Sequence, residues 1–283
     1  MGVANTIPGV SGGTLALMFG IYEELIEALR DGAKAAGFFI RGKISNGTTE
    51  LKSVNWGLLI PLGLGAVIAV VILAGPLESG LENHPEEMAG LFLGLVVGSI
   101  VISWRLLPHQ NVSTVAMIMG TGLIVFFCLG WQSGPISDPS PLVLFLAGAI
   151  TICAMILPGL SGSFLLLMFG LYESVLEVID DRLWGDAVVF AVGAVIGLAI
   201  FATLLDRLLN RHRTVVLAVL IGLMVGSLRV LWPWPHGVGS ETEPGVGLDW
   251  PSSGEFLVPT LLAIGAFMVV LAFDALSKRT IHS

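Results

Sequence analysis

Residues 7–23 read IPGVSGGTLALMFGIYE, and residues 157–173 read LPGLSGSFLLLMFGLYE. In each stretch a proline and a glycine, which break a helix, precede small polar residues and an apolar segment that restarts one. Such a break inside apolar sequence is unusual, and here it occurs twice. The repeated break therefore governs how the rest of the chain can fold.

The chain is far more apolar than a soluble domain. Of its 283 residues, 55% are hydrophobic and 12% are charged, and the mean hydropathy is +0.91. Soluble domains are roughly 25% charged, and several apolar runs here reach the roughly 17–25 residues that cross a bilayer as a helix. Because lipid cannot pair the backbone of an open sheet edge, the composition predicts an all-α polytopic membrane protein.

The charge of the connections predicts an orientation. We expect spans near residues 56–76, 89–105, 113–131, 140–157, 184–206, 214–232 and 256–275, with the two motif segments in addition. Lysine and arginine gather in 30–55, 105–112, 207–213 and the C-terminus, whereas 77–88 and 233–255 have none. The positive-inside rule then places the basic segments and the C-terminus on the cytoplasmic side of the plasma membrane. Residues 140–180 begin and end outside, so they cross twice or turn back at their PG break.

A second set of matches shows that more than the motif is repeated. The motif copies lie 150 residues apart (7 to 157), and later matches lie 128 apart (56 to 184). Matched glycines, tryptophans and histidines in order indicate an internal duplication. The matched pairs are Trp56-Gly57 with Trp184-Gly185, Gly65–Ile68 with Gly193–Ile196, His84 with His212, Gly94–Ser99 with Gly222–Ser227, and Trp104 with Trp232.

The predicted orientation makes the two halves inverted. The loop 77–88 is outside, whereas its equivalent at 206–213 is inside. We therefore expect one transmembrane domain built from inverted repeats, residues 1–131 and 132–283, as in secondary transporters that bind near the bilayer midplane. The second motif follows an apolar run at 141–156 and the first follows six residues, so the first hairpin looks truncated.

The residues after each PG break suit an anion. A restarted helix presents unpaired N–H groups and a positive dipole end, glycines admit close approach, and hydroxyls add donors. Small residues that merely pack helices closely are the alternative, but two inverted copies favour a site. The predicted substrate-binding residues are Pro8, Gly9, Ser11, Gly12, Gly13, Thr14, Pro158, Gly159, Ser161, Gly162, Ser163 and Arg229.

Acidic residues at the ends of the motif helices have two interpretations. Tyr22-Glu23 and Tyr172-Glu173 are coupling or gating candidates if they lie within the membrane, or ordinary interfacial residues if the helices have already emerged. The predicted coupling is to protons or sodium. Arg229 likewise either neutralises a phosphate or extends to the membrane surface.

Other classes of partner find little support. The net charge of −8 argues against nucleic acid. Cys128 and Cys153 lie in apolar segments without metal-ligand spacing, so we expect no metal and no cofactor. The expected partners are a lipid substrate and membrane lipids; the sequence gives no oligomeric state.

The motif residues resemble a known family. GVANTIPGVSGGT followed by FGIYE, the second PGLSG and both GLxVGS segments are similar to the bacterial and archaeal polyprenyl-phosphate transporters, across essentially the whole chain. The resemblance implies two re-entrant hairpins in inverted repeats. It also implies that undecaprenyl phosphate is returned to the cytoplasmic leaflet for reuse in envelope glycan synthesis.

Three alternatives stay open. A polyprenyl-diphosphate phosphatase shares inverted repeats and a PGxSRSxxT motif, but Gly12 and Gly162 stand where that motif has arginine. Phosphoryl transfer needs positioned charge on the transferred group, so we favour a transporter over an enzyme. A transporter of a small soluble anion and a structural protein without transport are the others.

Overall fold

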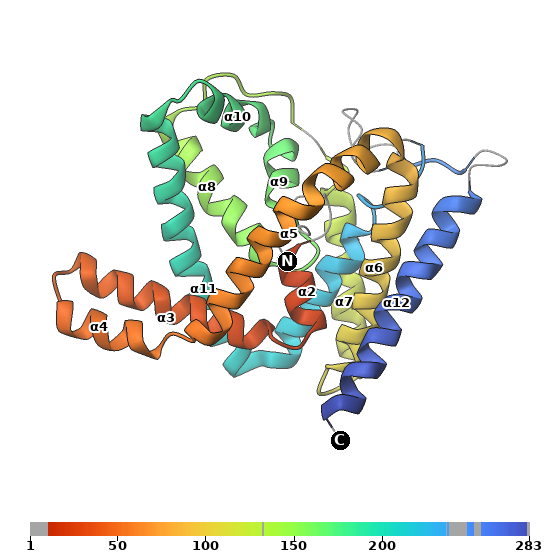
Figure 1. The fold of residues 1–283 in the computed structure, drawn as a ribbon, viewed down its shortest axis with the longest axis horizontal. Helices are drawn as coiled ribbons and strands as arrows, with labels where there is room; N and C mark the ends of the chain where they lie inside the picture. Colours follow the sequence, from red (N-terminus) through yellow and green to blue (C-terminus); the bar gives the residue numbers. More distant parts are fainter. Residues whose placement is uncertain (1–10, 132, 236, 238–247, 252–255, 282–283) are drawn as a thin grey trace.

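The computed structural model consists of helices and their connections within the residues that it describes, which are 11–131, 133–235, 237, 248–251 and 256–281. Figure 1 shows their arrangement. The helices are α2 (Gly12–Met18), α3 (Tyr22–Ile40), α4 (Ile44–Ser53), α5 (Trp56–Asn83), α6 (Pro85–Arg105), α7 (Val112–Cys128), α8 (Pro141–Ile156), α9 (Gly162–Met168), α10 (Tyr172–Asp180), α11 (Trp184–Ser227) and α12 (Leu257–Ile281).

Long apolar helices confirm a multi-pass membrane protein. Among the described residues, four helices are long and apolar enough to cross a bilayer, with windows at Trp56–Leu73, Pro85–Arg105, Trp184–Ser227 and Leu257–Leu276. The apolar helices α7 and α8 are shorter. Leucine, valine and isoleucine side chains of α5 and α12 lie exposed on the outside of the bundle, as expected where lipid is the solvent.

Three segments expected to be connections are mostly helical. The region 77–88 belongs almost entirely to α5 and α6, which are divided at His84. Proline disfavours helix in the residue before it and suits the first turn of a helix, so Pro85 ends one helix and starts the next. The region 207–213 lies within α11, interrupted at His212 (φ −137°, ψ 46°). The expected linker 30–55 forms the end of α3 and all of α4.

Glycines place the long helices in direct backbone contact. A Cβ on Gly94 of α6 would fall on the carbonyl oxygen of Ala263 in α12, and one on Gly226 of α11 would lie 2.6 Å from Cβ of Val125 in α7. Small residues allow this approach between membrane helices. The two GLxVGS segments are therefore helix-packing surfaces, and each pairs with a different outer helix.

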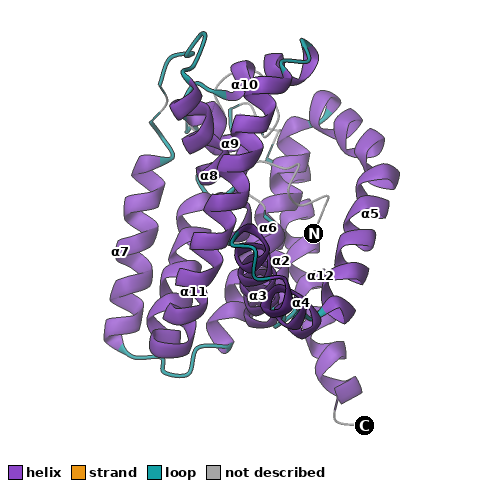
Figure 2. Ribbon diagram, turned by 90° about the vertical axis from the view of Figure 1, so that its left-hand side faces the viewer, coloured by secondary structure: helices purple, strands orange, loops and turns teal. Residues whose placement is uncertain are grey.

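The ends of the helices sort onto two sides of the molecule. Figure 1 shows that the C-terminus, the α6–α7 connection and the interruption in α11 lie at the lower end, whereas α10 and the α5–α6 junction lie at the upper end. Helices α3 and α4 pack against each other and project sideways, and Figure 2 shows them end-on. The main core joins α2, α3, α6 and the second part of α11.

The backbone repeats its special conformations. His84 has φ −140° and ψ 53°, close to the values of its sequence match His212. Gly20 and Gly170 have φ of 71° and 68°, a left-handed conformation that glycine adopts without strain. These residues end α2 and α9 with the same turn, so the matched sequence folds into matched local structure.

Candidate functional site

The two motif segments meet in the interior of the molecule. Helices α2 and α9 begin close to the same point and run toward opposite ends, as Figure 1 shows. The chain enters this point from the upper end through α8 and leaves again to the upper end through α9. Pro8 and Gly9 lie outside the described residues.

Two hydrogen bonds join the copies directly. The Ser11 hydroxyl donates to the Leu157 carbonyl oxygen at 2.7 Å, and the Gly159 N–H donates to Thr14 Oγ1 at 2.9 Å. Ser11 also caps α2, because its hydroxyl accepts from the Thr14 N–H at 3.3 Å. The exposed fractions of Ser11 and Thr14 are 0% and 1%.

The motif glycines serve close packing. A Cβ on Gly13 would fall on the Ile156 carbonyl oxygen, and one on Gly162 would lie 2.7 Å from Thr151 Cγ2. Gly159 has φ +82° and would place a Cβ 2.7 Å from Met224 Cα. Both its backbone conformation and the lack of space therefore exclude a side chain. Gly12 and Pro158 are buried. In this conformation the motif glycines therefore pack helices closely, which is the alternative to an anion site.

The second copy contributes a different set of contacts. The hydroxyls of Ser161 and Ser163 lie 2.8 Å apart, and Ser161 is buried. Ser161 precedes α9 without a side-chain bond to its backbone. The first copy's hydroxyls therefore bond to the backbone of the second copy, whereas the second copy's hydroxyls bond to each other.

Tyr22 and Glu23 do not end the first motif helix as expected, because α2 ends at Met18 and these residues begin α3. Tyr22 is buried, whereas Glu23 is exposed and its carboxylate accepts from Arg213 Nε at 2.6 Å. These residues line a cavity of about 180 Å³. At the end of α9, Tyr172 and Glu173 line a cavity of about 270 Å³. The motif helices therefore connect the central contact to a cavity at each end.

Arg229 lies two residues beyond α11, because the helix ends before the expected span limit of 232. Its guanidinium carbon lies 4.8 Å from the ring centre of Phe126 in α7, a cation–π contact. It lines a cavity of about 430 Å³ with Trp232 and Trp250. The structure places this arginine against Phe126 of α7.

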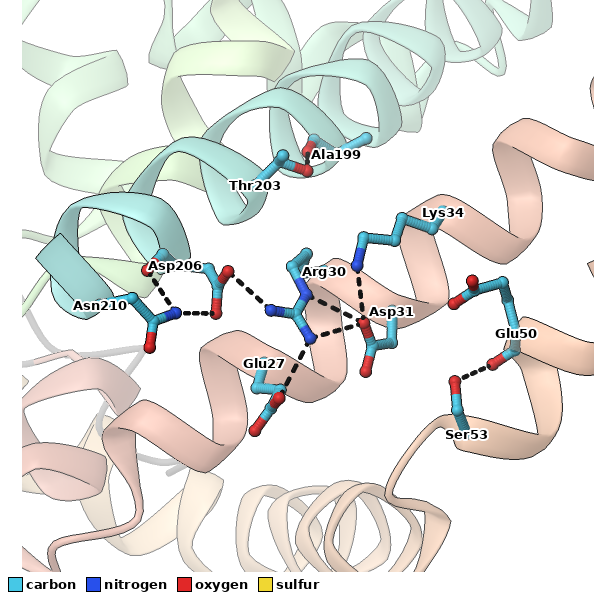
Figure 3. A network of polar contacts seen from close by, with 10 residues as sticks. All are labelled: Glu27, Arg30, Asp31, Lys34, Glu50, Ser53, Ala199, Thr203, Asp206 and Asn210. Atoms are coloured by element: carbon cyan, nitrogen blue, oxygen red, sulfur yellow. Dashed lines mark hydrogen bonds and ion pairs between the residues drawn. The ribbon is translucent and has the colours of Figure 1, made fainter.

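A charged network between α3 and α11 has no counterpart in the sequence predictions. Arg30 donates to Asp206 at 2.7 Å, to Asp31 at 2.9 Å and to Glu27 at 3.1 Å, and Asn210 donates to Asp206 at 3.2 Å (Figure 3). Burial alone would lower the pKa of Arg30, but its hydrogen bonds to Asp206 and Asp31 outweigh that effect and raise the pKa. Arg30 therefore stays charged.

One sequence signal could have found this network. Asp206 is an acid inside a long apolar helix and is 8% exposed, and buried acids in such helices have partners. Its partner in α3 is far away in the sequence, so spacing alone could not identify it. Among the described residues, the structure has no cluster of histidine, cysteine and acidic side chains that could hold a metal ion.

Comparisons with known proteins identify the family. A polyprenyl-phosphate transporter of Vibrio cholerae is 34% identical over 235 residues, covering 83% of this chain and 75% of that protein. One of Staphylococcus aureus is 29% identical over 250 residues, covering 82% and 83%. No solved structure matches. A sequence model of the undecaprenyl phosphate translocase-like family matches residues 1–245, and the chain belongs to that family.

Proposed function

We propose that the protein carries a polyprenyl phosphate across the cytoplasmic membrane, with the phosphate head group passing between the two motif segments. The observation that carries the proposal is the direct contact between the two copies at Ser11, Thr14 and Gly159. A lipid phosphate needs a polar path for its head while its tail stays in lipid. Hydroxyls and N–H groups that converge inside an apolar bundle supply donors for that path.

The closed contact implies a cycle. Because the motif hydroxyls are buried and partnered here, the head group reaches them when the first copy separates from α8 and α9. We propose that the halves are inverted repeats whose α8–α9 segment re-enters the membrane, and that they open to the two sides in turn. In the opened state, the head group would lose its bound water and accept hydrogen bonds from the donors that bond the two copies together in the closed state.

The tail has a place beside the second motif. A cavity of about 250 Å³ between α8 and α9 has almost entirely apolar walls, including Leu146, Ile150 and Leu165. It shares Ser133 with the more polar cavity of Tyr172 and Glu173. An apolar volume next to a polar one suits the first prenyl units of a lipid phosphate better than a small soluble anion.

We propose that the basic segments and the C-terminus face the cytoplasm, and that transport returns the carrier to the cytoplasmic leaflet for envelope glycan synthesis. Coupling to protons or sodium would use Glu23 or Glu173. If either acid couples transport, its replacement by glutamine changes the dependence of the rate on pH or sodium. An unchanged dependence in both variants would remove these acids from coupling.

The decisive experiment uses the purified protein in liposomes that contain a labelled polyprenyl phosphate. Exposure of the head group in each leaflet and release of inorganic phosphate are followed in the same sample. We expect leaflet exchange without phosphate release. Phosphate released from the corresponding diphosphate would establish a phosphatase instead, and absence of both signals would favour a transporter of a soluble anion.

A further inference from the structure

The cavity at the far end of α2 combines apolar walls with one arginine and two glutamates. Its volume is about 180 Å³, and it is lined by Leu17, Gly20, Tyr22, Glu23, Glu24, Leu106, Arg213 and Leu217. One water needs about 10–15 Å³ of such space, so a larger polar group fits. The leucines come from three different parts of the chain, and a charged side chain lies beside them.

The Tyr22 hydroxyl has no hydrogen-bond partner among the described residues, although Tyr22 is 1% exposed. Most buried polar atoms are hydrogen-bonded, and an unpaired one is costly. A structural role would be served equally well by phenylalanine. The hydroxyl is therefore unexplained by packing, and it belongs to a residue of the cavity wall.

The ion pair at the cavity contributes little to holding the fold. The side chains of Arg213 and Glu23 are 53% and 44% exposed, and pairs of this exposure have small net effects on stability. Arg213 donates to Glu23 through Nε. Among the described residues, its two terminal nitrogens have no acceptor, and a guanidinium binds a phosphate through paired donors of this kind.

The matching cavity at the other end of the molecule has a different lining. It is lined by Tyr172 and Glu173, and no arginine lines it among the residues that the structure describes. The repeat that matches His84 with His212 places Pro85 where the other half has Arg213. The duplicated tyrosine and glutamate are therefore accompanied by arginine at one end only, which makes the two cavities chemically different.

We propose that the cavity at the end of α2 is a docking site for a phosphomonoester, bound by the Arg213 guanidinium and the Tyr22 hydroxyl. The Glu23 carboxylate is an internal competitor, which occupies Arg213 until the phosphate displaces it. The assignment of a lipid as the source of the phosphate rests on the proposed transport function, but binding itself can be measured without transport.

The test measures equilibrium binding to the full chain in detergent micelles by calorimetry. The probes are geranylgeranyl phosphate, uncharged geranylgeraniol and inorganic phosphate. We expect Arg213→Gln and Tyr22→Phe each to weaken binding of the phosphate probes about 10-fold, since each removes a hydrogen bond to a charged group. We expect Glu23→Gln to tighten it several-fold.

Matched variants control for net charge. Arg211 is exposed and two residues from Arg213, and Glu82 is exposed at the end of α5. Neither is a lining residue of the cavity, so Arg211→Gln and Glu82→Gln should bind the probes as the unaltered chain does. If Arg213→Gln does not fold, Tyr22→Phe carries the test, because it removes an atom without a partner and should preserve the melting temperature.

The opposite signs of the two ion-pair variants decide the result. Weaker binding in Glu23→Gln, or unchanged binding in both Arg213→Gln and Tyr22→Phe, would overturn the proposal. Equal affinity for inorganic and geranylgeranyl phosphate would overturn the lipid assignment while the phosphate site stands. If the unaltered chain exchanges the lipid between leaflets but the variants bind the probes normally, this site is refuted and the proposed transport stands. If the variants change binding as expected but the unaltered chain shows no leaflet exchange, the proposed transport is refuted and the site stands.

Discussion

Replacing Thr14 with valine tests whether the two motif copies contact each other as described. Valine keeps the shape of threonine and removes the hydroxyl that accepts the Gly159 N–H at 2.9 Å. Thr14 is 1% exposed, so water cannot readily take its place. A buried donor left without a partner costs about 1–3 kcal/mol. The substitution should therefore destabilise the protein by that amount.

The same substitution at Thr151 provides a matched control. Its hydroxyl is buried without a hydrogen-bond partner among the described residues, and its methyl group, which lies beside Gly162, is retained in valine. Thr151→Val should leave stability unchanged or raise it slightly, because it removes an uncompensated polar atom. The two variants differ only in whether the lost hydroxyl has a partner.

Thermal unfolding of both variants in one detergent gives the comparison. In soluble proteins of about 150–250 residues, 1 kcal/mol shifts the melting temperature by about 2–4 °C, so we expect Thr14→Val to melt at least about 2 °C below Thr151→Val. Equal melting temperatures would refute the contact between the copies, and with it the closed state on which the proposed cycle depends.

Three further predictions address the network, the helix packing and the motif. Arg30→Gln should destabilise more than Asp206→Asn in the same melting assay. In Asp206→Asn, Arg30 keeps two other acidic partners, whereas in Arg30→Gln, Asp206 keeps only an amide partner; the reverse order would contradict the network. Gly94→Ala should lower the melting temperature by forcing a methyl group against α12, whereas Gly65→Ala, which meets nothing within 4 Å, should be neutral or stabilising. Ser11→Leu should stop leaflet exchange in liposomes while the protein still folds, and normal exchange would remove this hydroxyl from the path.

Much of the fold could be predicted because it depends on local chemistry. Apolar length predicted the membrane helices, and the PG breaks predicted that a helix restarts after each break, although α2 and α9 end after seven residues. The structure places Thr14 of α2 against Gly159 of the second break. The role of these residues in binding a phosphate stays a prediction.

Other features depend on contacts between distant parts of the chain, which spacing does not encode. Positive charge marked 30–55 and 207–213 as connections, but helix formation there follows from packing of α3 against α11 and from the Arg30–Asp206 pair. The pairing of α6 with α12 and of α7 with α11 has no local signal either, because glycines show where helices approach without naming the partner helix. Similarly, Tyr22 and Tyr172 have the same neighbours in sequence but differ in burial.

One bond between the copies, from the Gly159 N–H to Thr14 Oγ1, cannot be repeated with the two halves exchanged, and this has a mechanistic consequence. Both hydrogen bonds use side chains of the first copy, Ser11 and Thr14, and backbone groups of the second. The residue that matches Thr14 is Phe164, which has no hydroxyl and packs in an apolar cluster with Leu129. The reciprocal bond from Phe164 is therefore chemically impossible. If the two halves exchanged roles, the bond between Thr14 and Gly159 would have no equivalent. If the proposed halves open to the two sides in turn, we therefore expect the two half-cycles of transport to have different energy barriers.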